Sequence, residues 1–518
     1  MSKIKILWTD DEIEMLKPHI MFLEQKGYEI LTATNGDDAI DIVEAEQLDI
    51  VFLDENMPGI SGLETLEKIK EIDGSLPVVM ITKSEEERIM DDAIGGKIAD
   101  YLIKPVNPNQ ILLSLKKNLD EKRLVSEKTT TDYQREFRML SMEMSMVNDI
   151  EGWNALYQKL LNWELKLDSL QDEGLKEILA SQKREANEQF GKFIYNNYEE
   201  WLDGDEDAPV LSHEIFNKKI GPLLREKKKV FFILIDNLRM DQWKIIYPEI
   251  KDMYRMKQDD WFSSILPTAT QYARNAMFSG LLPKDIKKKH PQLWVEENEE
   301  GGKNMHEEEL LGLQLKRLGF GDRKYSYNKI TQLKAGKKLV DQSADLMRND
   351  LNVVVYNFVD MLSHAKTEMG MIKQLADDDK AYRSLTLSWF RNSPLLDLLK
   401  KLSEEDITVV VTTDHGTINV TSPVKVVGQK DLNTNLRYKT GRHMSYNDRE
   451  VFEIADPESV GLPKMTMSDV FVFTYGEDFF AYPNNFNHYV RYYQNTFQHG
   501  GISMEEMIIP IATLEPRK

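Results

Sequence analysis

The sequence predicts an α/β protein of several domains. Short apolar runs alternate with amphipathic stretches of about 10 to 15 residues at both ends of the chain, a pattern typical of parallel sheets covered by helices. The middle of the chain lacks strand-like runs and is rich in Glu, Lys, Leu and Met, which favours a helical bundle. A chain of 518 residues is also too long for a single core. We therefore expect a five-stranded parallel domain over residues 1–120, a helical domain over 121–220 and a larger α/β domain over 221–518.

Composition narrows the classes of function. The chain has no Cys, which excludes disulfides and thiolate metal sites and leaves His, carboxylate and hydroxyl groups as ligands. Its formal net charge of −21 works against duplex DNA binding, and residues 1–120 hold 12 Lys and Arg against 25 Asp and Glu. The first residues lack the basic and apolar regions of a signal peptide, and no apolar stretch approaches the roughly 18 residues that span a bilayer. We expect a cytoplasmic protein without membrane insertion.

Polar side chains follow the apolar runs of the first domain, at Asp10, Asp11, Asp54, Thr82 and Lys104. Because ligands collect at the carboxyl ends of parallel strands, we expect these side chains at one edge of the sheet. Carboxylates held together repel one another unless a cation lies among them, and an oxygen-only site that retains water suits Mg²⁺. Lys104 supplies a further positive charge, and Thr82 a hydroxyl for an incoming phosphoryl group. The alternative, acids in solvated turns, explains a single Asp better than it explains the full set.

These residues at these spacings, with the stretch LDENMPGISGLE around Asp54, resemble the receiver domain of two-component response regulators. The resemblance covers residues 1 to about 120. It implies phosphoryl acceptance by Asp54, Mg²⁺ binding by Asp10, Asp11, Asp54 and the main-chain carbonyl of Asn56, and switching by Thr82, Tyr101 and Lys104. It also implies a sensor histidine kinase as phosphodonor and a phosphorylation-promoted homodimer that pairs through roughly residues 84–117.

Three apolar runs of the last domain end in aspartate, at Asp236 in VFFILIDN, at Asp360 in NVVVYNFVD and at Asp414 in TVVVTTD. If all three runs are parallel strands, their carboxylates meet at one edge of a sheet. Histidines accompany them, with His364 one helical turn after Asp360, His415 next to Asp414, and His499 in the glycine-rich QHGG. Such sets without Cys suit paired Zn²⁺ or Mn²⁺ ions.

A candidate nucleophile stands in ILPTATQYARNAMFSGLLP. Thr270 follows a strand and a turn with proline, and it precedes a helix whose free N–H groups favour a phosphate. An ionised threonine hydroxyl beside a two-metal site can attack phosphorus and form a covalent intermediate. Taken alone, Thr270 is more typical of a helix cap than of a nucleophile, and His499 is more typical of a structural histidine than of a ligand.

Taken together, these motifs resemble the alkaline phosphatase superfamily, which includes phosphodiesterases, sulfatases and PglZ-type domains. Thr270 stands ten residues before Gly280, where that superfamily carries its nucleophile. The resemblance spans about 230–515 and implies two zinc ions, one held by Asp236, Asp414, His415 and Thr270, the other by Asp360, His364 and His499.

Candidate substrate contacts come from a basic stretch of the last domain and from the helix that follows Thr270. The stretch NLRYKTGRH concentrates cations around an aromatic ring, through Arg437, Tyr438, Lys439, Arg442 and His443. These side chains could grip a phosphate and stack a base, or they could belong to a solvated loop. Arg274 and Asn275 are further candidate phosphate contacts. We expect a diester, of nucleotide type, because the extra magnesium ligands of the monoesterases are not found.

The order of the three parts resembles PorX-type response regulators, a family associated with control of type IX secretion. That resemblance implies a sigma factor or a secretion component as a further partner. The competing interpretation is a non-enzymatic signalling module, in which a structural zinc site serves to bind transcription or secretion partners.

Overall fold

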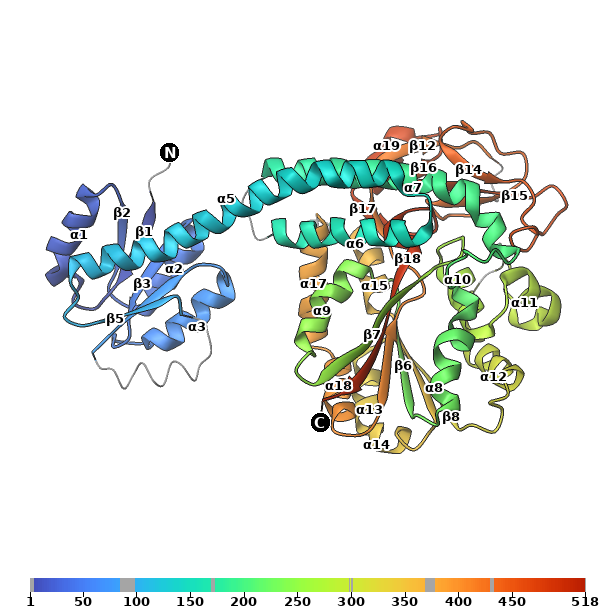
Figure 1. The fold of residues 1–518 in the computed structure, drawn as a ribbon, viewed down its shortest axis with the longest axis horizontal. Helices are drawn as coiled ribbons and strands as arrows, with labels where there is room; N and C mark the ends of the chain where they lie inside the picture. Colours follow the sequence, from blue (N-terminus) through green and yellow to red (C-terminus); the bar gives the residue numbers. More distant parts are fainter. Residues whose placement is uncertain are drawn as a thin grey trace. The chain divides into compact units, whose positions relative to one another are not determined.

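The computed structural model describes residues 4–83, 98–168, 173–297, 299, 301–368, 378–428 and 433–517, without the side chains of 116, 119–131, 173 and 364–368. The chain divides into two compact units, Met1–Phe137 and Arg138–Lys518 (Figure 1). Among the described residues, no helix has both the length and the apolar character needed to cross a membrane.

The first unit is built on the five-stranded parallel sheet that the sequence predicts. Its strand order is β2-β1-β3-β4-β5, and every neighbouring pair runs parallel. The strands are β1 (Lys5–Thr9), β2 (Glu29–Ala33), β3 (Ile50–Asp54), β4 (Val78–Thr82) and β5 (Asp100–Ile103). Strands β3 and β4 are buried along their whole length, as expected of apolar runs with helices on both faces.

Helices cover both faces of this sheet. On one face α1 (Lys17–Gln25) and the start of α5 (Pro108–Met146) pack over a core that includes Trp8 and Phe52. On the other face α2 (Gly36–Ala45) and α3 (Gly62–Ile72) pack over Leu7 and Leu53. A capping box starts α3, since Ser61 Oγ accepts from the N–H of Glu64 at 3.2 Å while Glu64 Oε2 accepts from the N–H of Ser61 at 2.9 Å.

The second unit begins with a helical region. It holds the end of α5, α6 (Ile150–Leu167) and α7 (Glu173–Leu202), which Figure 1 shows side by side. Aromatic side chains fill the space between α6 and α7, and the rings of Trp153 and Phe190 meet edge to face with centroids 5.6 Å apart. On the polar side, Lys159 of α6 pairs with Glu143 of α5 at 2.6 Å.

The larger α/β domain is built on a six-stranded sheet with the order β7-β18-β10-β6-β9-β8. Strands β10, β6, β9 and β8 run parallel, so the three aspartate-bearing runs of the sequence are parallel neighbours. Strand β18 runs antiparallel to both β10 and β7, which makes the sheet mixed. The strands are β6 (Val230–Ile235), β7 (Tyr254–Ser263), β8 (Tyr325–Ile330), β9 (Leu351–Tyr356), β10 (Thr408–Thr412) and β18 (Ile508–Pro516).

Helices and small sheets surround this sheet. The helices are α8 (Gly221–Arg225), α9 (Met240–Ile246), α10 (Thr270–Ser279), α11 (Pro283–Lys289), α12 (Glu307–Arg317), α13 (Leu333–Asp341), α14 (Ser343–Leu346), α15 (Phe358–Glu368), α17 (Asp379–Arg391), α18 (Pro394–Ser403), α19 (Phe486–Tyr493) and α20 (Met504–Met507). The small sheets pair β11 (Ile418–Val420) with β17 (Thr496–Gln498), β12 (Ser422–Lys425) with β16 (Asp478–Ala481), and β15 (Val470–Thr474) with both β13 (Tyr438–Gly441) and β14 (Val451–Ile454).

Candidate functional site

The first unit gathers three carboxylates and a lysine at the carboxyl edge of its sheet. Asp10 directly follows β1 and Asp54 ends β3, and both side chains are buried, whereas Asp11 is exposed. One carboxylate oxygen from each of these residues lies within 4.8 Å of the other two. Lys104 directly follows β5, and its Nζ lies 3.0 Å from Asp10 Oδ2 and 3.0 Å from Asp54 Oδ1. The structure therefore brings these four residues together.

Burial and charge compete at this cluster. Burial raises the pKa of Asp54, because a carboxylate loses hydration inside the protein, and Lys104 only partly offsets that effect. Burial by itself would lower the pKa of Lys104, but its hydrogen bonds to Asp10 and Asp54 outweigh this and raise it. Among the described residues Asp54 Oδ2 has no hydrogen-bond partner. A buried, unpartnered oxygen in an all-carboxylate set is a fitting ligand for a hard cation such as Mg²⁺.

The remaining predicted residues of this unit lie near the same edge. Thr82 ends the neighbouring strand β4 and is fully buried, and Tyr101 lies within β5 and is partly buried. Asn56 lies two residues beyond β3 with an exposed side chain. Residues 84–97 of the predicted dimer face lie outside the described residues. The roles of these residues stay predictions.

The larger domain gathers a second acidic cluster at the carboxyl edge of its own sheet. Asp236 directly follows β6, and Asp414 and His415 follow β10 by two and three residues. All three side chains are buried, and ligand atoms of all three lie within 4.8 Å of one another. Thr270 is the first residue of α10, and its Oγ1 lies 3.1 Å from His415 Nε2. The candidate nucleophile thus stands beside the candidate metal ligands.

A second pair of candidate ligands adjoins this cluster. His499 Nε2 lies 3.9 Å from Asp360 Oδ1, and the His499 ring stacks on the His415 ring with centroids 4.3 Å apart. The sequence predicted Asp360 at the end of a strand. This is wrong, because β9 stops at Tyr356 and Asp360 lies in the first turn of α15. A carboxylate is favourable there, at the positive end of a helix. His364 follows one turn later in α15, but its side chain lies outside the described ones.

Hydrogen bonds orient both histidines. The Nδ1 of His415 lies 3.0 Å from the carbonyl oxygen of Gly416, and the Nδ1 of His499 lies 3.1 Å from that of Thr268. A carbonyl oxygen can only accept, so Nδ1 carries the proton in each ring. The Nε2 lone pair is then available to a metal ion, in the manner usual for metal-binding histidines.

Arg274, a candidate phosphate contact, lies among the carboxylates of the cluster. Arg274 is fully buried, and its Nη2 donates to Asp236 Oδ2 at 2.6 Å. Its Nε lies 3.1 Å from Asp414 Oδ2 and 3.2 Å from Glu307 Oε1. Arg274 stands one helical turn after Thr270 and faces the same cluster, where the buried acids require a compensating cation. Asn275 is also buried, and its Nδ2 donates to the carbonyls of Gln271 and Lys303 at 2.8 and 3.0 Å.

The donor set of this cluster fits a metal of the zinc type. Asp236 Oδ1 is buried and has no hydrogen-bond partner among the described residues, although Asp236 Oδ2 also accepts from Asn357 Nδ2 at 2.7 Å. Carboxylate oxygens, imidazole nitrogens and one hydroxyl are the ligand types that remain without thiolates. Glu307 and Asn357 are partners that the sequence analysis missed. Glu307 starts α12, far from any strand end, whereas Asn357 directly follows β9 and stands inside the motif that was read as ending at Asp360.

The stretch at 435–443 does not form one cationic cluster. Arg437 is fully buried, and its guanidinium bonds to Glu506 Oε2 at 2.7 Å and to Thr474 Oγ1 at 2.9 Å. Tyr438 and Lys439 are buried within β13, where Tyr438 Oη bonds to Glu297 and Lys439 Nζ donates to the carbonyl of Asn433 at 2.7 Å. The solvated loop is therefore wrong for these three residues, because β13 is an internal part of the fold, and their contact with a substrate stays a prediction. Only Arg442 and His443 are exposed.

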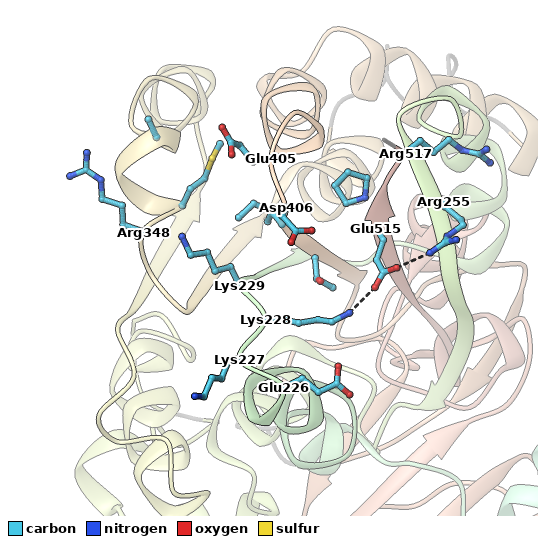
Figure 2. A pocket seen from close by; sticks show the side chains of 15 residues that line it. Glu226, Lys227, Lys228, Lys229, Arg255, Arg348, Glu405, Asp406, Glu515 and Arg517 are labelled. Atoms are coloured by element: carbon cyan, nitrogen blue, oxygen red, sulfur yellow. Dashed lines mark hydrogen bonds and ion pairs between the residues drawn. The ribbon is translucent and has the colours of Figure 1, made fainter.

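A cavity of about 1160 Å³ lies at the opposite edge of the larger sheet, where β6 and β10 begin and β18 ends (Figure 2). Figure 2 labels its charged lining residues, which are Glu226, Lys227, Lys228, Lys229, Arg255, Arg348, Glu405, Asp406, Glu515 and Arg517. Three of these charges pair with one another, as Glu515 bonds to Lys228 at 2.7 Å and to Arg255 at 3.0 Å. The described lining contains no histidine, and we place the chemistry at the other edge.

The pH dependence of stability tests whether Lys439 is buried within β13. Burial lowers the pKa of Lys439 to about 7 from its ordinary value of 10.5. Because the unfolded chain then binds more protons than the folded one, stability rises by roughly 1.4 kcal/mol per pH unit between those two values. Lys439→Met removes this pH dependence. We therefore expect the free energy of unfolding of the variant, measured with urea relative to that of the unchanged protein, to fall from about pH 7 to about pH 9.

The control for that experiment is Lys425→Met, which removes an exposed lysine of β12. Its difference from the unchanged protein should stay constant with pH. For Lys439→Met, a difference in the free energy of unfolding that stays constant or rises from about pH 7 to about pH 9 would contradict the buried position of Lys439.

Comparisons with known proteins agree with this architecture. Family models match the chain in three places: a response regulator receiver domain at residues 6–116, a PorX response regulator linker domain at 123–202, and a BREX system PglZ alkaline phosphatase-like domain at 215–514. Among solved structures, a CheY-like response regulator receiver domain protein from Methanospirillum hungatei is 30% identical, with a TM-score of 0.22, over 24% of this chain and 98% of that one.

Curated relatives match over the first part of the chain. The transcriptional regulatory protein PgtA of the phosphoglycerate transport system of Salmonella typhimurium is 28% identical over 159 residues, which are 31% of this chain and 37% of PgtA. The transcriptional regulatory protein ResD of Bacillus subtilis is 34% identical over 115 residues, which are 22% of this chain and 48% of ResD. The chain thus spans less than half the length of either relative.

The PglZ model, by contrast, covers more than half of this chain, and the receiver and linker models precede it in order. The chain therefore belongs to the PglZ alkaline phosphatase-like family and is a response regulator of the PorX type.

Proposed function

We propose that phosphorylation of Asp54 controls a zinc-dependent phosphodiesterase in the last domain, acting on diesters of nucleotide type. The domains proposed are a receiver over 1–120, a helical domain over 121–220 and a catalytic domain over 221–518. One observation carries the proposal: Thr270 Oγ1 lies 3.1 Å from His415 Nε2, beside a buried cluster of carboxylates at a helix start. A binding module has no need of a hydroxyl at that point.

Two ligand sets are proposed, Asp236, Asp414, His415 and Thr270 for one ion, and Asp360, His364 and His499 for the other. Zinc bound there would lower the pKa of the threonine hydroxyl and neutralise charge on the phosphate. The Thr270 oxygen forms a bond to phosphorus while the bond to one ester oxygen breaks, and the leaving alcohol takes up a proton. Free N–H groups at the start of α10 stabilise the phosphoryl oxygens. Water then cleaves the bond between Thr270 and phosphorus and restores the hydroxyl.

The structure leaves few of the predicted substrate contacts available to a substrate. Since Arg274 is held by carboxylates and Arg437, Tyr438 and Lys439 are buried, these side chains do not support recognition of a base or phosphate. Of the predicted substrate contacts, the exposed Arg442 and His443 remain candidates. The preference for a diester stays part of the proposal.

The receiver domain implies a sensor kinase as phosphodonor. We propose that the output controls type IX secretion and involves a sigma factor or a secretion component. The support is the match of residues 123–202 to the PorX linker domain, which the proposal extends to the biological role.

The first test concerns Asp54. Treatment with acetyl phosphate and Mg²⁺ should add one phosphoryl group, seen by mass spectrometry of the intact protein, because Asp54 presents a buried oxygen beside Lys104. Asp54→Ala should abolish the addition, and the control Asp41→Ala, which removes an exposed carboxylate of α2, should keep it. Modification that persists in Asp54→Ala would refute the assignment.

A second test concerns the homodimer. Beryllofluoride mimics an acyl phosphate, and we expect it to move the protein from monomer to dimer at micromolar concentration. A tenfold shift needs only about 1.4 kcal/mol of differential stabilisation. Sedimentation velocity measures the shift, and identical profiles with and without beryllofluoride would exclude it.

The third test concerns Thr270. Thr270→Val removes the hydroxyl while it keeps size and β-branching, so turnover of a chromogenic phosphodiester should fall by about three orders of magnitude or more. Zinc content should change little, whereas His415→Ala should lose zinc as well. The control Thr408→Val makes the same change at the far end of β10 and should retain activity.

Two results would speak against this role of Thr270. A Thr270→Val variant within about tenfold of the unchanged protein is incompatible with a nucleophile. Loss of activity and zinc together would identify Thr270 as a structural ligand and favour the non-enzymatic signalling module.

A further inference from the structure

Helix α7 makes hydrogen bonds to backbone that supports the candidate site. Asn187 of α7 is buried, and its Oδ1 accepts from the N–H of Met504 at 2.8 Å. Its Nδ2 donates to Glu505 Oε2 at 2.9 Å. Lys183, one turn earlier, lies 3.5 Å from Glu505 Oε1 and bonds to Glu164 of α6 at 2.6 Å. The helical region is thereby tied to the short helix α20.

Helix α20 packs directly against the residue that follows His415. A Cβ atom on Gly416 would lie 1.9 Å from the carbonyl oxygen of Glu505, so only glycine fits there. The N–H of Gly416 donates to the carbonyl of Glu506 at 3.2 Å, and the carbonyl of Gly416 accepts from His415 Nδ1 at 3.0 Å. The position of α20 therefore sets the orientation of the His415 ring.

The same helix supports His499 by a second route. Glu506 Oε1 accepts from the N–H of Gly501 at 2.9 Å. The Thr268 hydroxyl donates to the carbonyl of Gly501 at 2.9 Å and accepts from the N–H of Gly500 at 3.0 Å. His499 Nδ1 in turn donates to the carbonyl of Thr268 at 3.1 Å. Both candidate metal-binding histidines thus depend on α20.

Helix α7 also reaches the segment that carries Thr270. The hydroxyl oxygen of Tyr198 accepts from the N–H of Leu266 at 2.7 Å, and both residues are buried. Leu266 lies four residues before Thr270, in the segment that leads from β7 into α10.

We propose that Asn187 and Tyr198 are positioning residues of the catalytic domain, which hold Thr270 in place relative to His415 and His499. This inference rests on the proposed function, because it assigns the two residues to the same metal site. Neither side chain touches a candidate ligand. Each acts through one backbone segment, Asn187 through α20 and Tyr198 through Leu266, and both stand on the same helix α7. A displacement of α7 would therefore move the nucleophile and the histidine supports together.

Three variants test the proposal in the full-length protein. Tyr198→Phe removes one hydroxyl, and Asn187→Ala removes both hydrogen bonds to α20. The matched control is Tyr254→Phe, since the buried Tyr254 hydroxyl donates to the carbonyl of Leu399 at 2.7 Å near the opposite end of β7. Zinc affinity is measured by competition with a chromogenic chelator, and thermal stability by the midpoint of unfolding.

We expect Tyr198→Phe and Asn187→Ala each to weaken zinc binding by about tenfold, the low end of the range for residues that orient metal ligands. Tyr254→Phe should lower the unfolding midpoint by a similar amount, because it also loses a buried hydrogen bond, yet keep zinc affinity within about twofold. This difference separates positioning from general destabilisation. Tyr198→Phe decides the matter if Asn187→Ala does not fold.

Failure of this inference can be told from failure of the proposed function. If the unchanged protein binds no zinc, the proposed function falls and the inference falls with it. If the unchanged protein binds zinc and the two variants bind it equally well, only the positioning role is overturned. A loss of affinity in Tyr254→Phe as large as in the other two variants would overturn it as well.

Discussion

Repulsion between buried carboxylates is the constraint on which both candidate sites depend. Two charges about 4 Å apart interact by about 4 kcal/mol at an effective dielectric constant of about 20, so acids cannot be gathered without a compensating cation. In the first unit Lys104 stands between Asp10 and Asp54 at 3.0 Å from each. In the larger domain Arg274 stands between Asp236 and Asp414. Each site thus has its own protein cation, in addition to any metal ion that binds there.

Parallel strands explain why the acids meet at all. Strands β1 and β3 are parallel neighbours, as are β10, β6 and β9, so residues that follow them emerge at the same edge. The larger domain adds to this edge the start of α10, which presents Thr270 to His415. A hydroxyl, a set of acids and free helical N–H groups then share one place, which is what phosphoryl transfer requires.

Much of this arrangement could be predicted from the sequence, and the failures have physical reasons. Asp54 and Asp236 were found because each directly follows an apolar run. Asp360 was placed at a strand end because Phe358 and Val359 continue the apolar run, although the chain there has already turned into α15. Arg437 and Lys439 look like a surface cluster in the sequence, since nothing local shows that β13 is paired with β15 and buried.

The sequence by itself determined the α/β character, the order of the parts and the strand-end positions of residues such as Asp54 and Asp236, because these follow from local periodicity and from short motifs. Only the tertiary structure decided which cation compensates the acids of the larger domain and what supports its histidines. Arg274 meets Asp414 across 140 positions of the chain, and Asn187 meets Met504 across 317. Such contacts leave no periodic trace in the sequence, since they depend on how distant elements pack, and packing is a property of the whole fold.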